Sequence, residues 1–359
     1  NKIILRMYET YGVPYMGSKM KIIPSIHQAL SDVEYESVLD IFTGTTRVAQ
    51  SFRKAGKKVI ANDLSNASQC YGSLFLELED QSVLTPYLDE MNNLKGYKGW
   101  FTVNYHGDTT DNERGDGRFM QYHNTIKVDA ARDYVENLDV DSSIKRALVG
   151  CILFAIAKVD NTIGQQQAYL KEWCKRSYKD IIFKIPGTIS GPKGSVENKD
   201  CFDDYWKNVD VDVVYVDPPY SRNVWYPSYY HIYDSVTIWD KPETVGKANR
   251  RIDRSNIGKK QGIHDTKFYD NPWYSNNPHI GFTTLLENFP KSTFVISYSS
   301  DSAINKEDTL ELFSNYGAVT FYSIDHKTNV LGVLGGSTSG NKIITPKDKV
   351  KEYIYVVKR

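Results

Sequence analysis

One short run of the sequence, Asp217-Pro218-Pro219-Tyr220, has the parts needed to hold a planar amine. Two consecutive prolines fix the backbone and remove two N–H donors, so the run is rigid and presents bare carbonyls beside a carboxylate. The Asp217 carboxylate and the Pro218 carbonyl are then two acceptors for the hydrogens of an amine, and the ring of Tyr220 can stack on the heterocycle that carries it. These residue types predict a catalytic site that transfers a group to an amine.

Aspartates end three apolar runs that are rich in β-branched residues, at Asp40, Asp63 and Asp217. Such runs are typical of buried parallel strands, and residues 293–297 form another. Arg47–Ala55, between the first two runs, has its apolar residues at helical spacing, which predicts a strand-helix-strand unit and a doubly wound α/β sheet. Ligands bind at the carboxyl ends of the strands in such sheets, so we expect the three acids to face one crevice. Taken singly, each acid is also explained as a polar residue that ends a strand.

The alternation of strands and helices stops between residues 80 and 199. Helical patterns cover Val128 to Leu138 and Ser143 to Val159, with charged, Gly-rich connectors between helices. We therefore predict a helical insertion over 80–199 that recognises the target, and a catalytic domain made of 1–79 and 200–359.

Two β-rich runs close the sequence, Val319 to Ile324 and Glu352 to Val357, and a Gly/Ser-rich stretch lies between them. This pattern predicts a long-looped antiparallel pair. The whole chain is then expected to form a mostly parallel sheet with a C-terminal antiparallel hairpin.

Composition excludes several classes of protein. Lys plus Arg and Asp plus Glu both number 44, so the chain is not a polycation and any contact with nucleic acid must come from a local patch. The four cysteines lie far apart and form no C-x-x-C pair, so we expect neither a metal site nor a disulfide scaffold. This pattern favours a protein of the reducing cytoplasm. The most apolar segment, Ala147 to Val159, is too short to span a bilayer, so we expect no contact with a membrane.

Several motifs, taken together, resemble one family. The run Asp217–Tyr220 resembles the catalytic signature of amino-group DNA methyltransferases, and the segment that follows it, as far as His231, is similar to the Tyr-His segment of adenine methylases from restriction-modification systems. Tyr15-Met16-Gly17-Ser18-Lys19 resembles the N-terminal cofactor motif of that family, and 40–44 its Phe-x-Gly-x-Gly loop. The order of motifs is that of the alpha-type (Dam-like) DNA adenine-N6 methyltransferases, which implies a class I S-adenosylmethionine-dependent methyltransferase fold.

The resemblance implies S-adenosylmethionine as the cofactor. Asp63 would accept the two ribose hydroxyls, and Lys19 can reach a carboxylate. Thr46 stands where the family has its second loop glycine, and Thr45 or Thr46 is expected to cap the next helix. The residues expected to bind the cofactor are Tyr15, Met16, Gly17, Ser18, Lys19, Asp40, Phe42, Thr43, Gly44, Thr45, Asp63, Asp200, Cys201 and Asp217.

A basic stretch follows the catalytic run. Between Lys241 and Lys260 the chain has seven Lys or Arg against two acids, a local charge of plus five, and we predict a DNA-contacting loop over 240–262. A solvated surface would explain the same charges. Aromatic residues nearby are expected to stack on a flipped base or fill the gap that it leaves. The residues expected to contact DNA are Tyr226, Tyr230, His231, Lys247, Arg250, Arg251, Arg254, Lys259 and Lys260.

The expected reaction is therefore methylation of the N6 amine of an adenine flipped out of duplex DNA, with a cognate restriction endonuclease as a further candidate partner. Methylation of another planar amine, in RNA adenine, cytosine N4 or protein glutamine, is chemically close. An inactive DNA-binding module would also retain the fold, although an intact Asp217–Tyr220 run argues against it. A nicotinamide dehydrogenase is disfavoured because no G-x-G-x-x-G follows the first strand.

Overall fold

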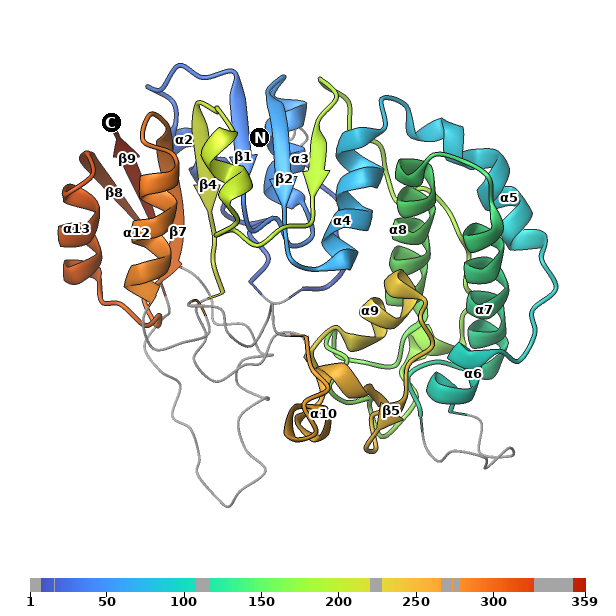
Figure 1. Cartoon of the computed structure of the whole chain (residues 1–359). Helices are drawn as coiled ribbons and strands as arrows, with labels where there is room; N and C mark the ends of the chain where they lie inside the picture. The colour runs from blue at the N-terminus through green and yellow to red at the C-terminus, as the bar shows by residue number, and fades with distance from the viewer. Residues whose placement is uncertain are drawn as a thin grey trace.

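A seven-stranded sheet forms one half of the molecule, and a lobe of helices forms the other (Figure 1). This computed structural model describes residues 8–15, 17–107, 117–219, 228–265, 273, 278–325 and 351–359. The strand order is β3-β2-β1-β4-β7-β9-β8. The strands are β1 (Ser37–Asp40), β2 (Lys58–Asn62), β3 (Ser195–Glu197), β4 (Val213–Val216), β7 (Thr293–Ser299), β8 (Ala318–Asp325) and β9 (Lys351–Lys358).

The first five strands in this order, β3, β2, β1, β4 and β7, are parallel to one another. β9 is antiparallel to both of its neighbours, β7 and β8. The predicted antiparallel pair at the end of the chain is confirmed, since Val319 lies opposite Val357 and Ile324 opposite Glu352. The structure adds that β9 lies inside the sheet, between β7 and β8, and not at its edge. The arrangement is that of a class I methyltransferase fold, as predicted.

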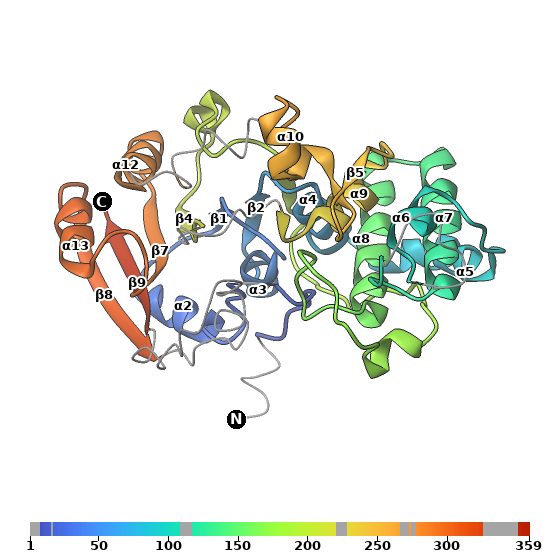
Figure 2. The same cartoon turned by 90° about the horizontal axis from the view of Figure 1, so that it is seen from below.

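Helices cover both faces of the sheet, which is why the central strands bury apolar side chains on both faces. Along β1, Val38 packs towards α2 (Ile23–Ala29) and α3 (Arg47–Lys54), whereas Leu39 belongs to the core on the opposite face. That opposite face is covered by α12 (Pro278–Asn288) and α13 (Lys306–Ser314), as Figure 2 shows from below. The helix predicted over Arg47–Ala55 is thus confirmed as α3.

The helical lobe is built around α8 (Ser142–Val159), whose side chains from Ala147 to Ala157 are all buried. It agrees with the helix predicted over Ser143–Val159, and α7 (Tyr122–Asn137) includes most of the other predicted helix. The other helical segments that connect to or surround α8 are α4 (Asn66–Gly72), a π-helix at Ser73–Glu77, a 3-10 helix at Gln81–Leu84, α5 (Thr85–Asn93), α6 (Trp100–Tyr105) and α9 (His231–Ile238).

The lobe and the sheet do not divide where the sequence suggested. β3 lies within 80–199 but pairs with β2, with Ala61 opposite Val196, so the sheet resumes before residue 200. Two short 3-10 helices, Lys175–Tyr178 and Asp204–Asn208, lie on either side of it in the chain.

The chain after α9 stays beside the helical lobe. A two-stranded hairpin, β5 (Thr244–Val245) with β6 (Arg250–Arg251), leads into a 3-10 turn at Ile252–Arg254 and α10 (Asn256–Lys260). The hairpin is fixed to the lobe because the Thr244 hydroxyl donates to the Asn104 side-chain oxygen on α6, at 2.8 Å. None of the helices in the described part of the chain is both long and apolar enough to cross a bilayer.

Candidate functional site

Three aspartates meet at one edge of the sheet. Asp40 ends β1, Asp63 follows β2 and Asp217 follows β4, and these three strands are parallel neighbours. Burial raises the pKa of Asp40 to about 8, and the nearby negative charges of Asp217 and Asp63 contribute. The charges of both other carboxylates reach Asp40, so the three acids lie near one another at this edge.

Asp40 shapes the loop that follows β1. Its Oδ2 accepts from the Thr43 hydroxyl at 2.9 Å and from the backbone N–H of Ala49 at 3.2 Å. Within the described part of the chain, its buried Oδ1 has no hydrogen-bond partner. One oxygen of the Asp40 carboxylate therefore holds the loop and α3, and the other can accept a hydrogen bond from a bound group.

Asp63 faces the other side of the same loop. Its Oδ2 accepts from the backbone N–H of Gly44 at 2.8 Å, and its Oδ1 from that of Ser65 at 2.9 Å. Gly44 has a φ of 52°, and a Cβ there would approach the Tyr15 ring at 3.1 Å. The loop thus needs glycine at this position, where the ring of Tyr15 from the N-terminal motif packs against it.

Thr46, at the position where the resemblance expected a second loop glycine, has a left-handed backbone conformation with a φ of 62°. Thr46 is the N-cap residue of α3, but its side chain makes no capping hydrogen bond, so the expected threonine side-chain cap was wrong. Asp40 instead accepts from the N–H of Ala49 in the first turn of α3. The Thr46 hydroxyl instead donates to the Thr45 carbonyl and accepts from the Gln50 amide at 2.9 Å. Gln50 in turn exchanges two hydrogen bonds of 2.8 Å with the backbone of Tyr11, which ties the N-terminal segment to α3.

The catalytic carboxylate predicted at Asp217 lies in a buried cluster of charges. The Lys19 ammonium is 3.0 Å from Asp217 Oδ1 and 3.2 Å from Glu352 Oε1, so it binds both carboxylates. Burial raises the pKa of Asp217 to about 7; Lys19 opposes this effect and Glu352 adds to it. In this structure Lys19 contacts Asp217, the predicted catalytic acid, whereas the sequence had suggested that it reaches the cofactor.

The remaining predicted cofactor residues lie around the same edge of the sheet. Asp200 accepts from the backbone N–H of Phe202 at 3.0 Å, and the Cys201 thiol accepts from the indole N–H of Trp273 at 3.3 Å. The Trp273 ring is stacked parallel to Phe202 and meets Phe42 edge-on, which forms an aromatic wall.

The N-terminal motif turns sharply before it reaches Lys19. Gly17 has a φ of 81°, a left-handed conformation that favours glycine, and Ser18 follows it directly. Met16 lies outside the described residues. The turn brings the Gly17 carbonyl within 3.2 Å of the Lys19 ammonium, so the motif helps to hold its own lysine.

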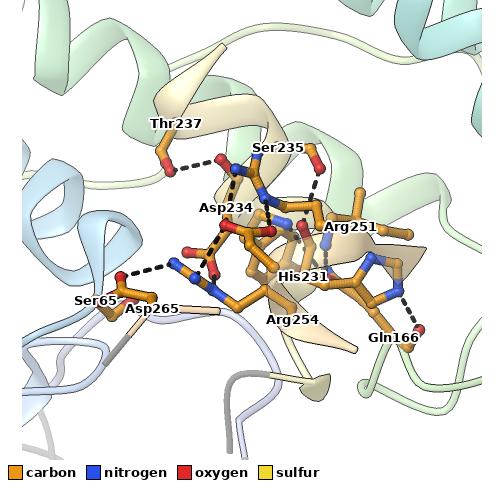
Figure 3. A network of polar contacts seen from close by, with 12 residues as sticks. Ser65, Gln166, His231, Asp234, Ser235, Thr237, Arg251, Arg254 and Asp265 are labelled. Atoms are coloured by element: carbon orange, nitrogen blue, oxygen red, sulfur yellow. Dashed lines mark hydrogen bonds and ion pairs between the residues drawn. The ribbon is translucent and has the colours of Figure 1, made fainter. Parts of the chain in front are cut away.

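Two of the basic residues expected to contact DNA are buried in ion pairs. Arg251 is 1% exposed and donates to both oxygens of Asp240, at 2.6 and 2.8 Å. Arg254 is 2% exposed, and its Nε donates to Asp234 on α9 at 2.8 Å. Figure 3 shows both guanidinium groups directed into this network, which also includes Asp253 and Asp265. Direct contact of these arginines with phosphate is not supported, because their donors are used inside the protein.

Two of the ring residues expected at the DNA, Tyr230 and His231, are also packed inside. Tyr230 is stacked on Tyr15 with ring centroids 4.8 Å apart, and only 6% of it is exposed. His231 is fully buried beside the Gln166 carbonyl, 2.9 Å from its Nε2, and burial lowers its pKa to about 3. A neutral, buried imidazole does not bind phosphate, so His231 supports the fold. Tyr220 and Tyr226 lie outside the described residues.

Four other basic residues were expected to contact DNA. Lys247, in the hairpin, and Lys259 and Lys260, on α10, are exposed, and Arg250 on β6 is half-buried. Ser255 accepts from the backbone N–H of Gly258 at 2.9 Å and so begins α10. A Cβ on Gly258 would lie 2.0 Å from the Ile252 carbonyl, so the turn is tightly closed. The hairpin and α10 therefore carry their lysines on either side of a tightly closed turn.

Sequence reasoning missed three residues that organise the site. The Asn62 amide donates to the carbonyls of Ile41 and Lys199, at 3.2 and 3.0 Å, and thereby joins the loops after β1 and β3. The Gln166 side chain accepts from two backbone N–H groups at the start of α9. Glu352 binds Lys19. Asn62, directly before Asp63, could have been found from its place at a strand end, but no local signal identifies Gln166.

Comparison with known proteins agrees with this geometry. Residues 15–321 match the family described as D12 class N6 adenine-specific DNA methyltransferase. The chain is 24% identical over 320 residues to Modification methylase LlaI of Lactococcus lactis subsp. lactis, covering 83% of this chain and 48% of LlaI. It is 24% identical over 336 residues to the type II methyltransferase M.CviAII of Paramecium bursaria Chlorella virus 1, covering 88% of this chain and 92% of that one. It is also 24% identical over 328 residues to the type II methyltransferase M.NlaIII of Neisseria lactamica, covering 87% of this chain and 91% of that one. The chain thus spans about half the length of some of these relatives and most of the length of others.

Proposed function

Since this chain belongs to the D12 class N6 adenine-specific DNA methyltransferases, we propose that it transfers a methyl group from S-adenosylmethionine to the N6 amine of an adenine flipped out of duplex DNA. The relatives carry the names of modification methylases and type II methyltransferases, so we propose the same role here, in the cytoplasm of a bacterial or phage-infected cell, beside a cognate endonuclease. The observation that carries the proposal is the Asp217 carboxylate, held at the crevice directly after β4 and followed by two prolines.

The residues of this chain can prepare an amine for the reaction. An adenine amine is a poor nucleophile because its lone pair is delocalised into the ring. Asp217 and the Pro218 carbonyl would accept its two hydrogens, which favours the pyramidal nitrogen that methyl transfer requires. Asp217 has a pKa of about 7, raised by burial, so the same carboxylate can take up the proton that the methylated amine releases.

The crevice fits S-adenosylmethionine, which when bound supplies an electrophilic methyl group. Several of its side chains suit parts of that molecule. Each Asp63 oxygen accepts one backbone N–H, which leaves lone pairs for ribose hydroxyls, and the Phe42, Phe202 and Trp273 rings can pack on an adenine. Asp40 Oδ1 is buried and, in the described part of the chain, has no hydrogen-bond partner. A bound ammonium group would satisfy that oxygen and offset the burial that raises the pKa of Asp40.

DNA would lie against the exposed lysines. Lys247 on the hairpin and Lys259 and Lys260 on α10 are candidates for phosphate contacts, with Arg250 beside them. The helical lobe carries this hairpin through the Thr244–Asn104 hydrogen bond, so we propose that lobe and hairpin together recognise the target. Tyr220 remains the candidate for stacking on the flipped base.

The test is transfer of a radiolabelled methyl group to unmethylated duplex DNA, followed by sequencing that maps modified adenines. Wild type should modify adenine at one sequence, and Asp217→Ala should lose at least a hundredfold in rate, on the order of what misplacing a reacting group costs. An increase in fluorescence from 2-aminopurine at the target would report base flipping. Label appearing only in RNA, cytosine or protein would replace the proposed substrate, and an Asp217→Ala rate within tenfold of wild type would contradict the catalytic assignment.

A further inference from the structure

Glu352 lies beside the catalytic carboxylate although it comes from the far end of the chain. It is on β9, and its backbone lies opposite Ser299 of β7 and Ile324 of β8. Its side chain is 6% exposed, and that of Lys19 is 7% exposed. A carboxylate this deeply buried is costly unless its partners compensate, so its position needs an explanation.

The Lys19 ammonium is held by three acceptors that match its three protons. They are Asp217 Oδ1 at 3.0 Å, Glu352 Oε1 at 3.2 Å and the Gly17 carbonyl at 3.2 Å. Glu352 is itself oriented, because the Ser297 hydroxyl on β7 donates to its Oε1 at 2.6 Å. A chain of contacts thus runs from Ser297 to the carboxylate that acts on the substrate.

We propose that Glu352 is a positioning residue for methyl transfer: it holds the Lys19 ammonium against Oδ1 of Asp217, so that Oδ2 of that carboxylate is the acceptor presented to the substrate amine. The inference rests on the proposed function, since it concerns the amine that Asp217 binds. It assigns a task to the last strand of the sheet, which otherwise only completes the fold.

The charges explain why a second acid is needed. With Lys19 alone, one cation would pair with one carboxylate, and Asp217 would be a weak acceptor for an incoming N–H. With Glu352, one positive charge is shared by two carboxylates, and the cluster keeps a negative charge for the amine. Within the described residues, the titratable groups that face Asp217 from the surrounding elements are Lys19, Glu352, Asp40 on β1 and Tyr215 on β4.

The test separates charge from shape. Glu352→Gln keeps the size and the oxygen that Ser297 and Lys19 contact, but it removes the charge. Because Glu352 raises the pKa of Asp217, its removal should lower that pKa and move the acidic limb of the kcat profile to lower pH. We expect kcat at neutral pH to fall about ten- to a hundredfold, as for a misplaced reacting group, while KM for DNA and for the cofactor stays within about twofold. Glu352→Asp keeps the charge, so its acidic limb should stay at the wild-type pH although kcat falls.

The matched control is Glu311→Gln on α13, the same substitution at an exposed glutamate, which should leave both readouts unchanged. If Glu352→Gln does not fold, as judged by circular dichroism, Ser297→Ala decides, because it removes only the bond that orients Glu352, and kcat should fall severalfold. An active wild type whose kcat and pH profile survive Glu352→Gln, or a fully active Ser297→Ala, would overturn the inference. A wild type that methylates no adenine would instead overturn the proposed function.

Discussion

Replacing Arg254 tests whether the basic stretch contacts DNA with this residue or is held together by it. Arg254 is 2% exposed and its Nε donates to Asp234, whose carboxylate is itself only 8% exposed. Arg254→Met would leave Asp234 buried without its charge partner, which typically costs about 3 to 5 kcal/mol. Whole-protein stability is commonly about 5 to 15 kcal/mol, so the variant should be visibly less stable.

The assay is equilibrium unfolding in urea, followed by tryptophan fluorescence, at low and high salt. The decrease in stability should persist at high salt because a buried pair is screened far less than an exposed one. The double variant Asp234→Leu/Arg254→Met should recover most of it, since apolar residues can replace a buried ion pair at little cost. The control Lys260→Met removes an exposed cation from the same unit and should change stability by about 0.5 kcal/mol or less.

The opposite pattern would refute this reasoning. If Arg254→Met unfolds like wild type but binds DNA more weakly, with a flatter salt dependence, Arg254 is a phosphate contact, as its sequence context suggested. Equal decreases in stability in the single and double variants would show that Asp234 and Arg254 do not depend on each other.

Other substitutions test the cofactor crevice, the exposed lysines and the strained loop. Asp63→Ala should weaken cofactor binding by about 1 to 3 kcal/mol, the worth of two hydrogen bonds, without changing DNA affinity; calorimetry with S-adenosylmethionine would show this, and unaltered affinity would return Asp63 to a strand terminator. Replacing Lys247, Lys259 and Lys260 by Gln should lower the slope of log DNA affinity against log salt by about 0.9 for each phosphate that is no longer neutralised, whereas an unchanged slope would place these lysines away from DNA. Thr46→Gly should be about 1 to 2 kcal/mol more stable in urea than Thr46→Ala, because alanine retains the left-handed strain at a φ of 62°; equal stabilities would mean that the strain is small.

The sequence predicted the parts of the fold that depend on local pattern. Apolar runs ending in Asp40, Asp63 and Asp217 correctly indicated parallel strands, and the spacing of Val48 and Phe52 indicated α3. A run of β-branched residues also identified β9, but nothing local shows that it inserts between β7 and β8. That position depends on pairing across the whole chain.

Long-range pairing also explains what was missed at the site. Lys19 and Glu352 are more than three hundred residues apart, and a lysine in a motif looks the same whether it faces a cofactor or a carboxylate. Arg251 and Arg254 look like DNA-binding residues because the nearby sequence is basic. The partner of Arg254 is Asp234 on α9, and the partner of Arg251 is Asp240, between α9 and the hairpin. Charge counted along a sequence does not show which cations are already paired.

The place of β9 inside the sheet has a consequence for how the chain folds during synthesis. Of the seven strands described in this sheet, β9 emerges from the ribosome last, yet β7 and β8 are joined through it and not to each other. Until residues 351–358 are available, the facing edges of both strands are exposed, and such edges are prone to pair with other chains. Sheet closure and delivery of Glu352 to Lys19 therefore happen together, so a nascent chain cannot assemble its complete charge cluster before the sheet is whole.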